Sequence, residues 1–166
     1  FAFFRKGIGI QPIFHGGEQE KGARSSTENV HAILGMEKAL EITYANLEKD
    51  KIKMQELKSY FISELQKLSR KIVFNGLSNH LEKGTYTVLS TRFPVKNDLF
   101  LFSLDMAGIA VSGGSACQSG SNKGSHVLHE ILNAVEADKT SIRFSFSKFT
   151  TKKEIDTTVL KLKSLL

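Results

Sequence analysis

From Val30 to Leu68 apolar residues recur at the spacing of an α-helix, and the length of this stretch constrains the fold more than any other feature of the chain. A straight helix of that length would span about 55–60 Å at 1.5 Å per residue, which is too long for one small domain. We therefore expect a break or bend between Asn46 and Lys51. Two apolar stripes recur at helical spacing within the stretch: Val30, Ile33, Leu34, Leu40 and Tyr44, then Met54, Leu57, Phe61, Leu65 and Leu68.

Strand, turn and cap signals flank this helical stretch. Residues 1–14 indicate short strands or extended chain, and residues 15–27 form a loop rich in glycine and charge. Runs of Val, Ile, Thr, Tyr and Phe predict strands at residues 71–75, 85–93, 109–112 and 140–147. Further helices are expected at residues 97–106, 125–132 and after position 151, and the expected N-caps are Ser26 or Thr27, Asn97, Ser125 and Thr151. The fold class that follows is α/β, with a small, largely antiparallel sheet covered by helices.

Composition excludes several classes of protein. The chain has 166 residues, 40% of them hydrophobic and 24% charged, which is ordinary for one globular domain. No apolar run approaches the roughly 18 residues of a membrane span. The formal net charge of +6 comes largely from lysines that alternate with acidic residues, as on solvated helix faces. Because no aromatic and basic residues interleave, the sequence disfavours a nucleic-acid-binding module.

The single cysteine, Cys117, lies in an unusual setting. Residues 111–121 surround it with three glycines and four serines, whereas a packed cysteine normally has apolar neighbours. We expect residues 113–122 to be mobile and the thiol to reach solvent. One cysteine forms neither an intrachain disulfide nor an all-cysteine metal site. Two interpretations remain, a nucleophile on a tether and a free surface cysteine; Lys123 or His126 would lower its pKa if close.

Three segments together resemble one enzyme family. Each retains a run of residues in the family's order, and the three cover essentially the whole chain. The similar segments are His15–Asn29, Ser112–Ser121 followed by Ser125–Leu128, and Ser141–Phe146 followed by Phe149–Asp156. They resemble the NifS/IscS-like cysteine desulfurases, which are pyridoxal-phosphate (PLP) enzymes of the class V aminotransferase group and have the PLP fold type I.

The resemblance implies specific roles for three residues. Cys117 matches the nucleophile that takes sulfur from L-cysteine as a persulfide and leaves L-alanine. Arg143 matches the arginine that binds the substrate carboxylate, a role that suits a planar guanidinium. Thr27 matches the threonine that contacts the PLP phosphate of the neighbouring subunit, and a helix start would add amide donors. Glu18 and Ser26 replace glycines of the family pattern, and His15 is assigned no catalytic role.

The resemblance also implies what this chain lacks. The family's PLP-binding lysine follows a histidine, and here the five histidines precede Gly, Ala, Leu, Val and Glu. We therefore expect a C-terminal part of the enzyme that neither holds PLP covalently nor desulfurates cysteine by itself. The expected division is the end of the large domain at residues 1–29, a linking helical region at 30–68 and the small domain at 69–166. The opening at Phe1, without methionine or signal peptide, agrees with this expectation.

The expected partners follow from the same resemblance. They are L-cysteine, a sulfur-acceptor protein such as an iron–sulfur scaffold, and a second subunit in a cytoplasmic homodimer, with no metal, nucleic acid or membrane. Two alternatives stay open: a class V enzyme with another substrate, and a non-enzymatic domain for sulfur relay or protein binding. The cysteine loop argues against the first alternative, because transamination needs no mobile thiol.

Overall fold

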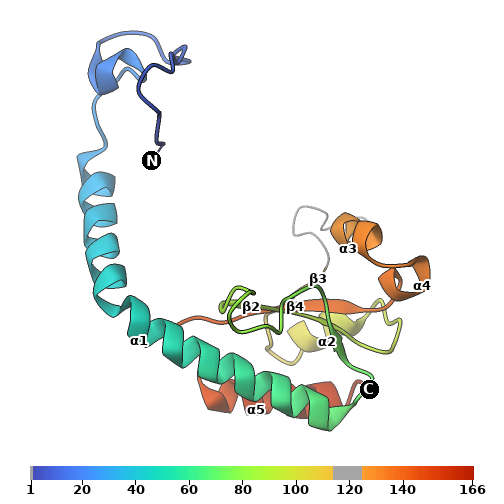
Figure 1. The fold of residues 1–166 in the computed structure, drawn as a ribbon. Helices are drawn as coiled ribbons and strands as arrows, with labels where there is room; N and C mark the ends of the chain where they lie inside the picture. The colour runs from blue at the N-terminus through green and yellow to red at the C-terminus, as the bar shows by residue number, and fades with distance from the viewer. Residues whose placement is uncertain (1, 114–124) are drawn as a thin grey trace. The chain divides into compact units, whose positions relative to one another are not determined.

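The computed structural model describes residues 2–113 and 125–166 (Figure 1). By its contacts the chain divides into two units, Phe1–Asn46 and Leu47–Leu166, here called the first and second unit. The expected division at positions 29 and 68 concerns the large and small domains of a whole enzyme and stays a prediction.

The first unit begins with irregular chain. Its described part up to Asn29 contains one short 3-10 helix, η1 (Gln19–Gly22), so the short strands considered for residues 1–14 are not formed. The loop expected at residues 15–27 is otherwise confirmed. Ser25 is buried and donates a hydrogen bond from Oγ to the carbonyl oxygen of Gly17, at 2.8 Å, which fastens the loop to itself.

Helix α1 (Val30–Leu68) starts differently from the prediction. Asn29, and neither Ser26 nor Thr27, provides the cap, because its Oδ1 accepts a hydrogen bond from the Ala32 amide at 3.2 Å. The helix is continuous, so the break considered between Asn46 and Lys51 is not formed, and the alternative, a bend there, stays a prediction. The boundary between the two units falls at Asn46 and Leu47, within the range given for the break or bend.

Four antiparallel strands form the sheet of the second unit. They are β1 (Val73–Phe74), β2 (Val88–Arg92), β3 (Ser112–Gly113) and β4 (Ser141–Ser145), in the spatial order β1-β2-β4-β3. All four lie within or next to the predicted runs. In the register, Ser90 and Ser112 are both opposite Arg143, so these three residues share one face of the sheet.

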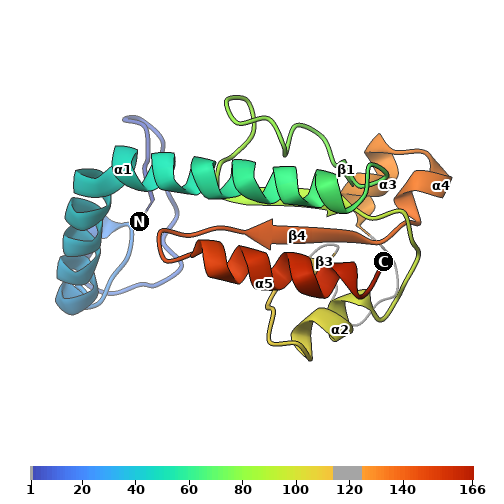
Figure 2. The same cartoon turned by 90° about the horizontal axis from the view of Figure 1, so that it is seen from below.

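The two faces of this sheet differ in chemistry. The inner face is apolar and carries the core, namely Leu89, Phe93, Ile142, Phe144 and Phe146 together with the buried hydroxyl of Thr91. Helices α1 and α5 (Lys152–Lys163) run side by side against it (Figure 2). The Phe61 ring of α1 meets the Phe144 ring edge-on, with centroids 4.9 Å apart. The outer face carries Ser90, Arg92, Ser141 and Arg143.

Three shorter helices lie in the described part of the second unit. Helix α2 (Phe100–Asp105) buries Phe100 and Leu104 in the core, with Leu99 rather than Asn97 at its N-cap position. Helix α3 (His126–Ile131) is capped by Ser125, as expected, and α4 (Ala134–Ala137), which was not expected, is capped by Asn133. Thr151 and Glu154 form a capping box at the start of α5, which confirms that N-cap. The predicted fold class, α/β with a small antiparallel sheet and helices, is therefore confirmed.

Candidate substrate-carboxylate site

Arg143 lies on the outer face of the sheet, in the middle of β4. Its neighbours Ile142 and Phe144 point the other way and are 2% and 5% exposed, so the core holds this part of the backbone rigidly. The Arg143 side chain itself is exposed. Its Nε donates a hydrogen bond to the Ser112 Oγ at 3.0 Å. That bond orients the guanidinium and leaves its terminal nitrogens available for a planar anion such as a carboxylate.

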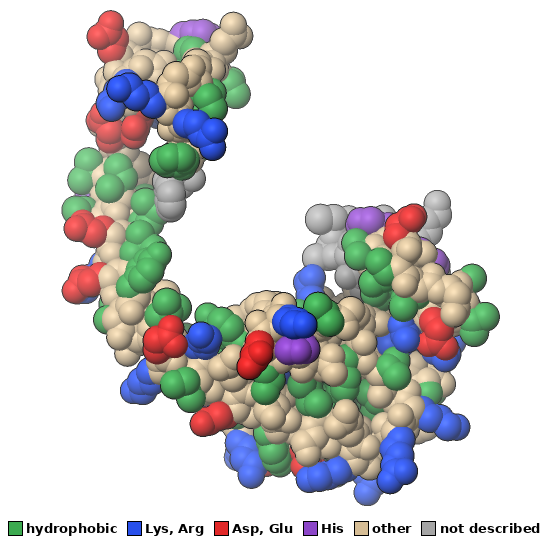
Figure 3. Space-filling view, viewed as in Figure 1, with side chains coloured by type: hydrophobic (Ala, Val, Ile, Leu, Met, Phe, Trp, Pro, Cys, Tyr) green, Lys and Arg blue, Asp and Glu red, His purple; other side chains and the backbone are tan. Residues whose placement is uncertain are grey.

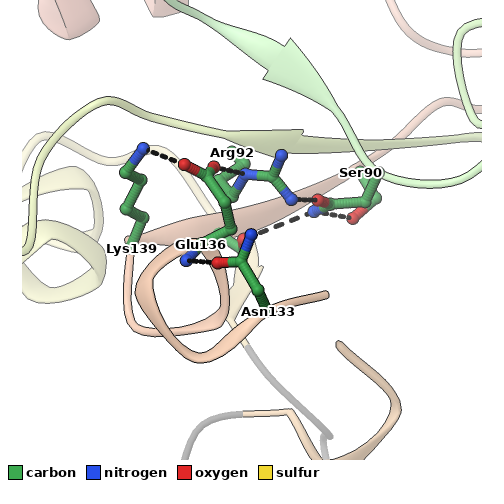
Figure 4. A network of polar contacts seen from close by, with 7 residues as sticks. Ser90, Arg92, Asn133, Glu136 and Lys139 are labelled. Atoms are coloured by element: carbon green, nitrogen blue, oxygen red, sulfur yellow. Dashed lines mark hydrogen bonds and ion pairs between the residues drawn. The ribbon is translucent and has the colours of Figure 1, made fainter. Parts of the chain in front are cut away.

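A polar network covers the neighbouring part of the outer face (Figure 4). Asn75, just after β1, is buried and donates from Nδ2 to the hydroxyls of Ser90 and Ser141, at 3.0 and 3.3 Å. Its Oδ1 accepts a hydrogen bond from the Nη1 of Arg92 at 2.9 Å. Ser90 is the residue directly opposite Arg143, so the network reaches the immediate neighbourhood of that guanidinium.

Glu136 on α4 compensates the charge of Arg92. Its Oε2 lies 3.0 Å from the Arg92 Nε, and the side chain of Arg92 is only 11% exposed. The second carboxylate oxygen accepts a hydrogen bond from Lys139 (Figure 4). The hydrogen bond from Lys139, with the attraction of Lys139 and Arg92, lowers the pKa of Glu136 below its ordinary 4.5 against a smaller opposing effect of burial. Glu136 is therefore a carboxylate at neutral pH.

Within the described part of the chain, Arg143 differs from Arg92 in having no carboxylate partner. Across residues 2–113 and 125–166, no carboxylate lies within ion-pair distance of its guanidinium. The same ranges contain no group of three or more His, Cys, Asp or Glu side chains that could hold a metal ion. The exposed cation at position 143 is thus suited to binding an anion supplied from outside the chain.

Cys117 belongs to residues 114–124, which lie outside the described residues. The expectations of a mobile loop and of Lys123 close to the thiol fall there too. The described residues do fix where this segment is attached. It follows directly on β3, whose Ser112 pairs with Arg143, and it ends at Ser125, the N-cap of α3. In the sequence, Cys117 is four positions from the end of the strand that lies beside the candidate carboxylate site.

Thr27 lies in the first unit and Arg143 in the second, and each of these two units is described by itself. Thr27 is exposed. The amides of Val30 and Ala32 at the start of α1 are already engaged by the Glu28 carbonyl and the Asn29 side chain. Thr27 therefore offers an anion its side-chain hydroxyl, and the start of the helix adds few free amide donors.

Two residues depart from the family pattern. Glu18 is exposed, and Ser26 adopts a left-handed φ of 91° that favours glycine.

Sequence reasoning missed the residues that support Arg143. Ser112 was expected as the end of a strand and the start of the family-like cysteine segment, without a role beside Arg143, and Asn75, Arg92 and Glu136 were assigned no role. The alternation of polar residues along 141–145 could have indicated the outer face, but no sequence signal joins Glu136 to Arg92.

A pocket of about 450 Å³ lies elsewhere, near Phe61, Ile109, Phe144 and Ile155, and Arg143 is not among the residues that line it.

Comparison with known proteins decides the family. A model of the class-V aminotransferase family matches residues 13–158. The chain belongs to this family. It is 39% identical over 158 residues to a protein named cysteine desulfurase IscS from Dictyoglomus turgidum, covering 95% of this chain and 39% of that protein. It is 36% identical over 160 residues to a putative cysteine desulfurase IscS 1 from Bacillus subtilis, covering 95% and 41%.

Solved structures agree with this assignment. A structure described as a NifS-like protein matches with a TM-score of 0.79 at 30% identity, covering 98% of this chain and 40% of that one. A NifS-like protein from Rickettsia africae matches with a TM-score of 0.74 at 27% identity, covering 95% and 40%. The chain thus has the fold of part of a NifS-like protein. It spans about two fifths of the length of these relatives.

Proposed function

We propose that this chain supplies the substrate-carboxylate site and the sulfur acceptor of a PLP-dependent cysteine desulfurase. The reaction converts L-cysteine to L-alanine and leaves the sulfur on Cys117 as a persulfide. The observation that carries the proposal is the exposed guanidinium of Arg143, which lacks a carboxylate partner among the described residues and lies on the strand paired with β3. The names of the relatives support the same reaction.

In this proposal Arg143 binds and orients the substrate. The substrate carboxylate accepts hydrogen bonds from the terminal nitrogens, while Ser112 holds Nε. Because β4 is anchored by the buried Ile142 and Phe144, the backbone that carries the guanidinium stays in place when the substrate arrives. A fixed carboxylate sets the direction in which the substrate's sulfur points, and such positioning is a large part of what an active site contributes.

Cys117 performs the chemical step as a thiolate. Its sulfur attacks the sulfur of the bound cysteine, and a sulfur–sulfur bond forms as the carbon–sulfur bond breaks. The electron pair of the broken bond remains with carbon, which takes up a proton on the way to alanine. The chain between Gly113 and Cys117 spans at most roughly 14 Å, so the thiol is tethered within reach of β3 and β4.

One side chain among the described residues is suited to contact PLP. The exposed hydroxyl of Thr27 is a suitable donor to a phosphate, although the capped helix end adds little. When bound, PLP supplies the electron withdrawal that weakens the bonds at the substrate's α-carbon. No lysine of this chain follows a histidine. We therefore propose that the 166-residue chain alone forms no borohydride-reducible bond to PLP and does not desulfurate cysteine.

Two variants test the proposal in the longest natural polypeptide that contains this chain, loaded with PLP. We expect Arg143→Ala to raise KM for cysteine by about ten- to a hundredfold, the effect of losing one charge-assisted contact, with PLP affinity retained. The matched control is Arg70→Ala, an exposed arginine in the turn that follows α1. Equal losses of PLP and cysteine affinity would show that Arg143 serves the cofactor or the fold instead.

Cys117→Ser tests the acceptor separately. We expect it to abolish the persulfide, detected by alkylation and mass spectrometry, while the enzyme still binds cysteine. A variant that released sulfide at the wild-type rate would remove Cys117 from the mechanism. A wild-type enzyme that turned over another amino acid but not cysteine would indicate a class V enzyme with a different substrate.

The partners of the whole enzyme are part of the same proposal. They are a sulfur-acceptor protein such as an iron–sulfur scaffold and a second subunit, in the cytoplasm. The exposed apolar stripe of α1 supports an interface with further protein, because large apolar side chains rarely gather on a free surface. Among the helices the structure describes, none has the length and hydropathy needed to cross a membrane. Light scattering of the loaded enzyme tests the dimer.

A further inference from the structure

The outer face of the sheet presents two arginines close together. Arg92 on β2 is opposite Ser141, and Arg143 on β4 is opposite Ser90, so the two arginines occupy diagonal positions on one face. Diagonal neighbours in an antiparallel pair have their backbone positions about 7–8 Å apart. Arginine side chains are long enough for the two guanidiniums to contact one ligand that carries two carboxylates.

Among residues 2–113 and 125–166, a carboxylate pairs with only one of these two arginines. Arg92 is held by Asn75 and Glu136 and is nearly buried, whereas Arg143 is exposed and bonded to the neutral hydroxyl of Ser112. Glu136 is itself fixed by the amide-capping contact of Asn133 at the start of α4 and by Lys139 (Figure 4). The Glu136 carboxylate is therefore held in a fixed position on α4, beside Arg92.

We propose that Glu136 determines how many carboxylates the outer face accepts: by pairing with Arg92, it restricts the site at Arg143 to amino acids with a single carboxylate. This inference rests on the proposed function, because it assumes that Arg143 binds the substrate. L-cysteine carries one carboxylate and satisfies the restriction. A dicarboxylate such as aspartate would place its second charge next to Glu136, where it meets a negative group instead of a free cation.

Removing the Glu136 charge reverses this preference. In Glu136→Gln the amide keeps the size of the side chain and its hydrogen-bond acceptor, but Arg92 is left without a compensating charge. A nearly buried cation without a partner attracts an anion. The second carboxylate of a ligand bound at Arg143 then supplies that anion. The wild-type restriction is thus an effect of charge pairing and not of pocket size.

Succinate and succinamate provide the test, since they have the same shape and differ by one carboxylate. Their affinities for the 166-residue chain are measured at constant ionic strength from the NMR signals of the arginine Nε–H groups. We expect the ratio of succinate to succinamate affinity to rise about two- to fivefold in Glu136→Gln, the range for an ion pair in which the carboxylate of the bound ligand stays in contact with solvent. The rise should disappear again in Glu136→Gln/Arg92→Met.

The matched control is Asp138→Asn. Asp138 is two positions away and forms an exposed ion pair with Lys96 at 2.8 Å, so its replacement removes the same charge from the same region without touching Arg92. The ratio should stay at its wild-type value. An equal rise in Asp138→Asn, or no rise in Glu136→Gln, overturns the proposal. If Glu136→Gln does not fold, Glu136→Ala removes the same charge and is judged by the same ratio.

Failure of the proposed function would look different. If Arg143→Ala left the succinamate affinity unchanged, Arg143 would not be the carboxylate site, and the proposed function would fail with the inference. If Arg143→Ala abolished binding while the ratio in Glu136→Gln stayed at the wild-type value, only the role of Glu136 would be wrong. In the PLP-loaded enzyme the same variants should change inhibition by succinate more than the KM for cysteine.

Discussion

The two halves of α1 carry similar apolar stripes but lie in opposite surroundings. In the first unit, Val30, Leu34 and Tyr44 are 54%, 56% and 71% exposed, and hydrophobic side chains are visible along this part of the surface (Figure 3). In the second unit, Phe61 and Leu65 are 2% and 0% exposed. Both halves carry an apolar stripe at helical spacing, yet among the described residues only the second stripe is part of a core.

This difference shows which structural features apolar periodicity predicts and which it does not. A stripe at three- and four-residue spacing indicates a helix with one apolar face. It does not indicate which partner covers that face, because the partner lies elsewhere in the sequence or in another polypeptide. For the second half the partners are the inner face of the sheet and α5. The first half has no comparable partner among the described residues.

The largest expected effect comes from truncating the covered stripe. Phe61→Ala removes a ring that contacts Phe144 and Phe146, and we expect it to lower the free energy of unfolding by about 3–5 kcal/mol. Leu34→Ala, on the exposed stripe, should change it by less than about 0.5 kcal/mol. Denaturant unfolding of the 166-residue chain at low concentration measures both. Similar losses in the two variants would mean that the first stripe is also buried in solution, and a concentration-dependent midpoint would identify a second copy as its cover.

The fold was predictable where local sequence decides the structure. Runs of β-branched and aromatic residues marked the four strands, and Ser125 and Thr151 marked two helix starts. Errors occurred where two polar residues competed for one role. Asn29 was overlooked as the cap of α1 because Ser26 and Thr27 precede it, and Asn97 turned out to bond the Leu99 amide ahead of α2.

The candidate site was predictable only in part. Arg143 was identified through the family resemblance, and its place between Ile142 and Phe144 predicts only that its side chain faces away from the core. Its neighbour Ser112 is 31 positions away, and Glu136 joins Arg92 across 44 positions, so these contacts follow from the order of the strands and not from any local pattern. The order β1-β2-β4-β3, which brings β3 beside Arg143, is a property of the folded chain.

Helix caps offer a second comparison of the two units, with a smaller effect. Thr151 at the start of α5 shares a capping box with Glu154, and Thr151→Ala should lower the free energy of unfolding by about 1 kcal/mol. Asn29→Ala removes the single cap bond of α1, whose first turns are exposed. It should increase amide hydrogen exchange near Ala32 and leave the unfolding midpoint unchanged. An equal shift of the midpoint in both variants would show that the first unit unfolds together with the second.

The strained residue Ser26 gives a test confined to the first unit. A φ of 91° has a higher conformational free energy for serine than for glycine, so Ser26→Gly should stabilise the loop locally by up to about 1 kcal/mol. Slower amide exchange and slower proteolysis between residues 15 and 29 are the expected signs. Ser69→Gly, at a position without a positive φ, is the control and should not slow either process. Faster proteolysis in Ser26→Gly would mean that loop flexibility outweighs the strain.

The smallest effect concerns a contact that joins the covered half of α1 to α5. The hydroxyl of Tyr60 donates a hydrogen bond to the Asp156 carboxylate at 2.7 Å, and Lys152 lies 4.6 Å from the centre of its ring. The hydrogen bond to Asp156 raises the pKa of Tyr60 to about 12, with smaller effects of burial and of the charges of Asp156 and Glu64.

The folded state therefore keeps the Tyr60 proton at a pH where the unfolded chain loses it. The small stabilisation is complete below about pH 10 and is lost as the pH rises toward about 12. With Tyr44 and Tyr86 replaced by phenylalanine, Tyr60 is the remaining tyrosine, so ultraviolet absorbance of the phenolate reports its titration alone. Asp156→Asn in the same background should bring the titration back toward pH 10, because the amide neither carries a charge nor prefers the protonated phenol. An unchanged midpoint in Asp156→Asn would show that burial against α5, and not the hydrogen bond, holds the proton on Tyr60.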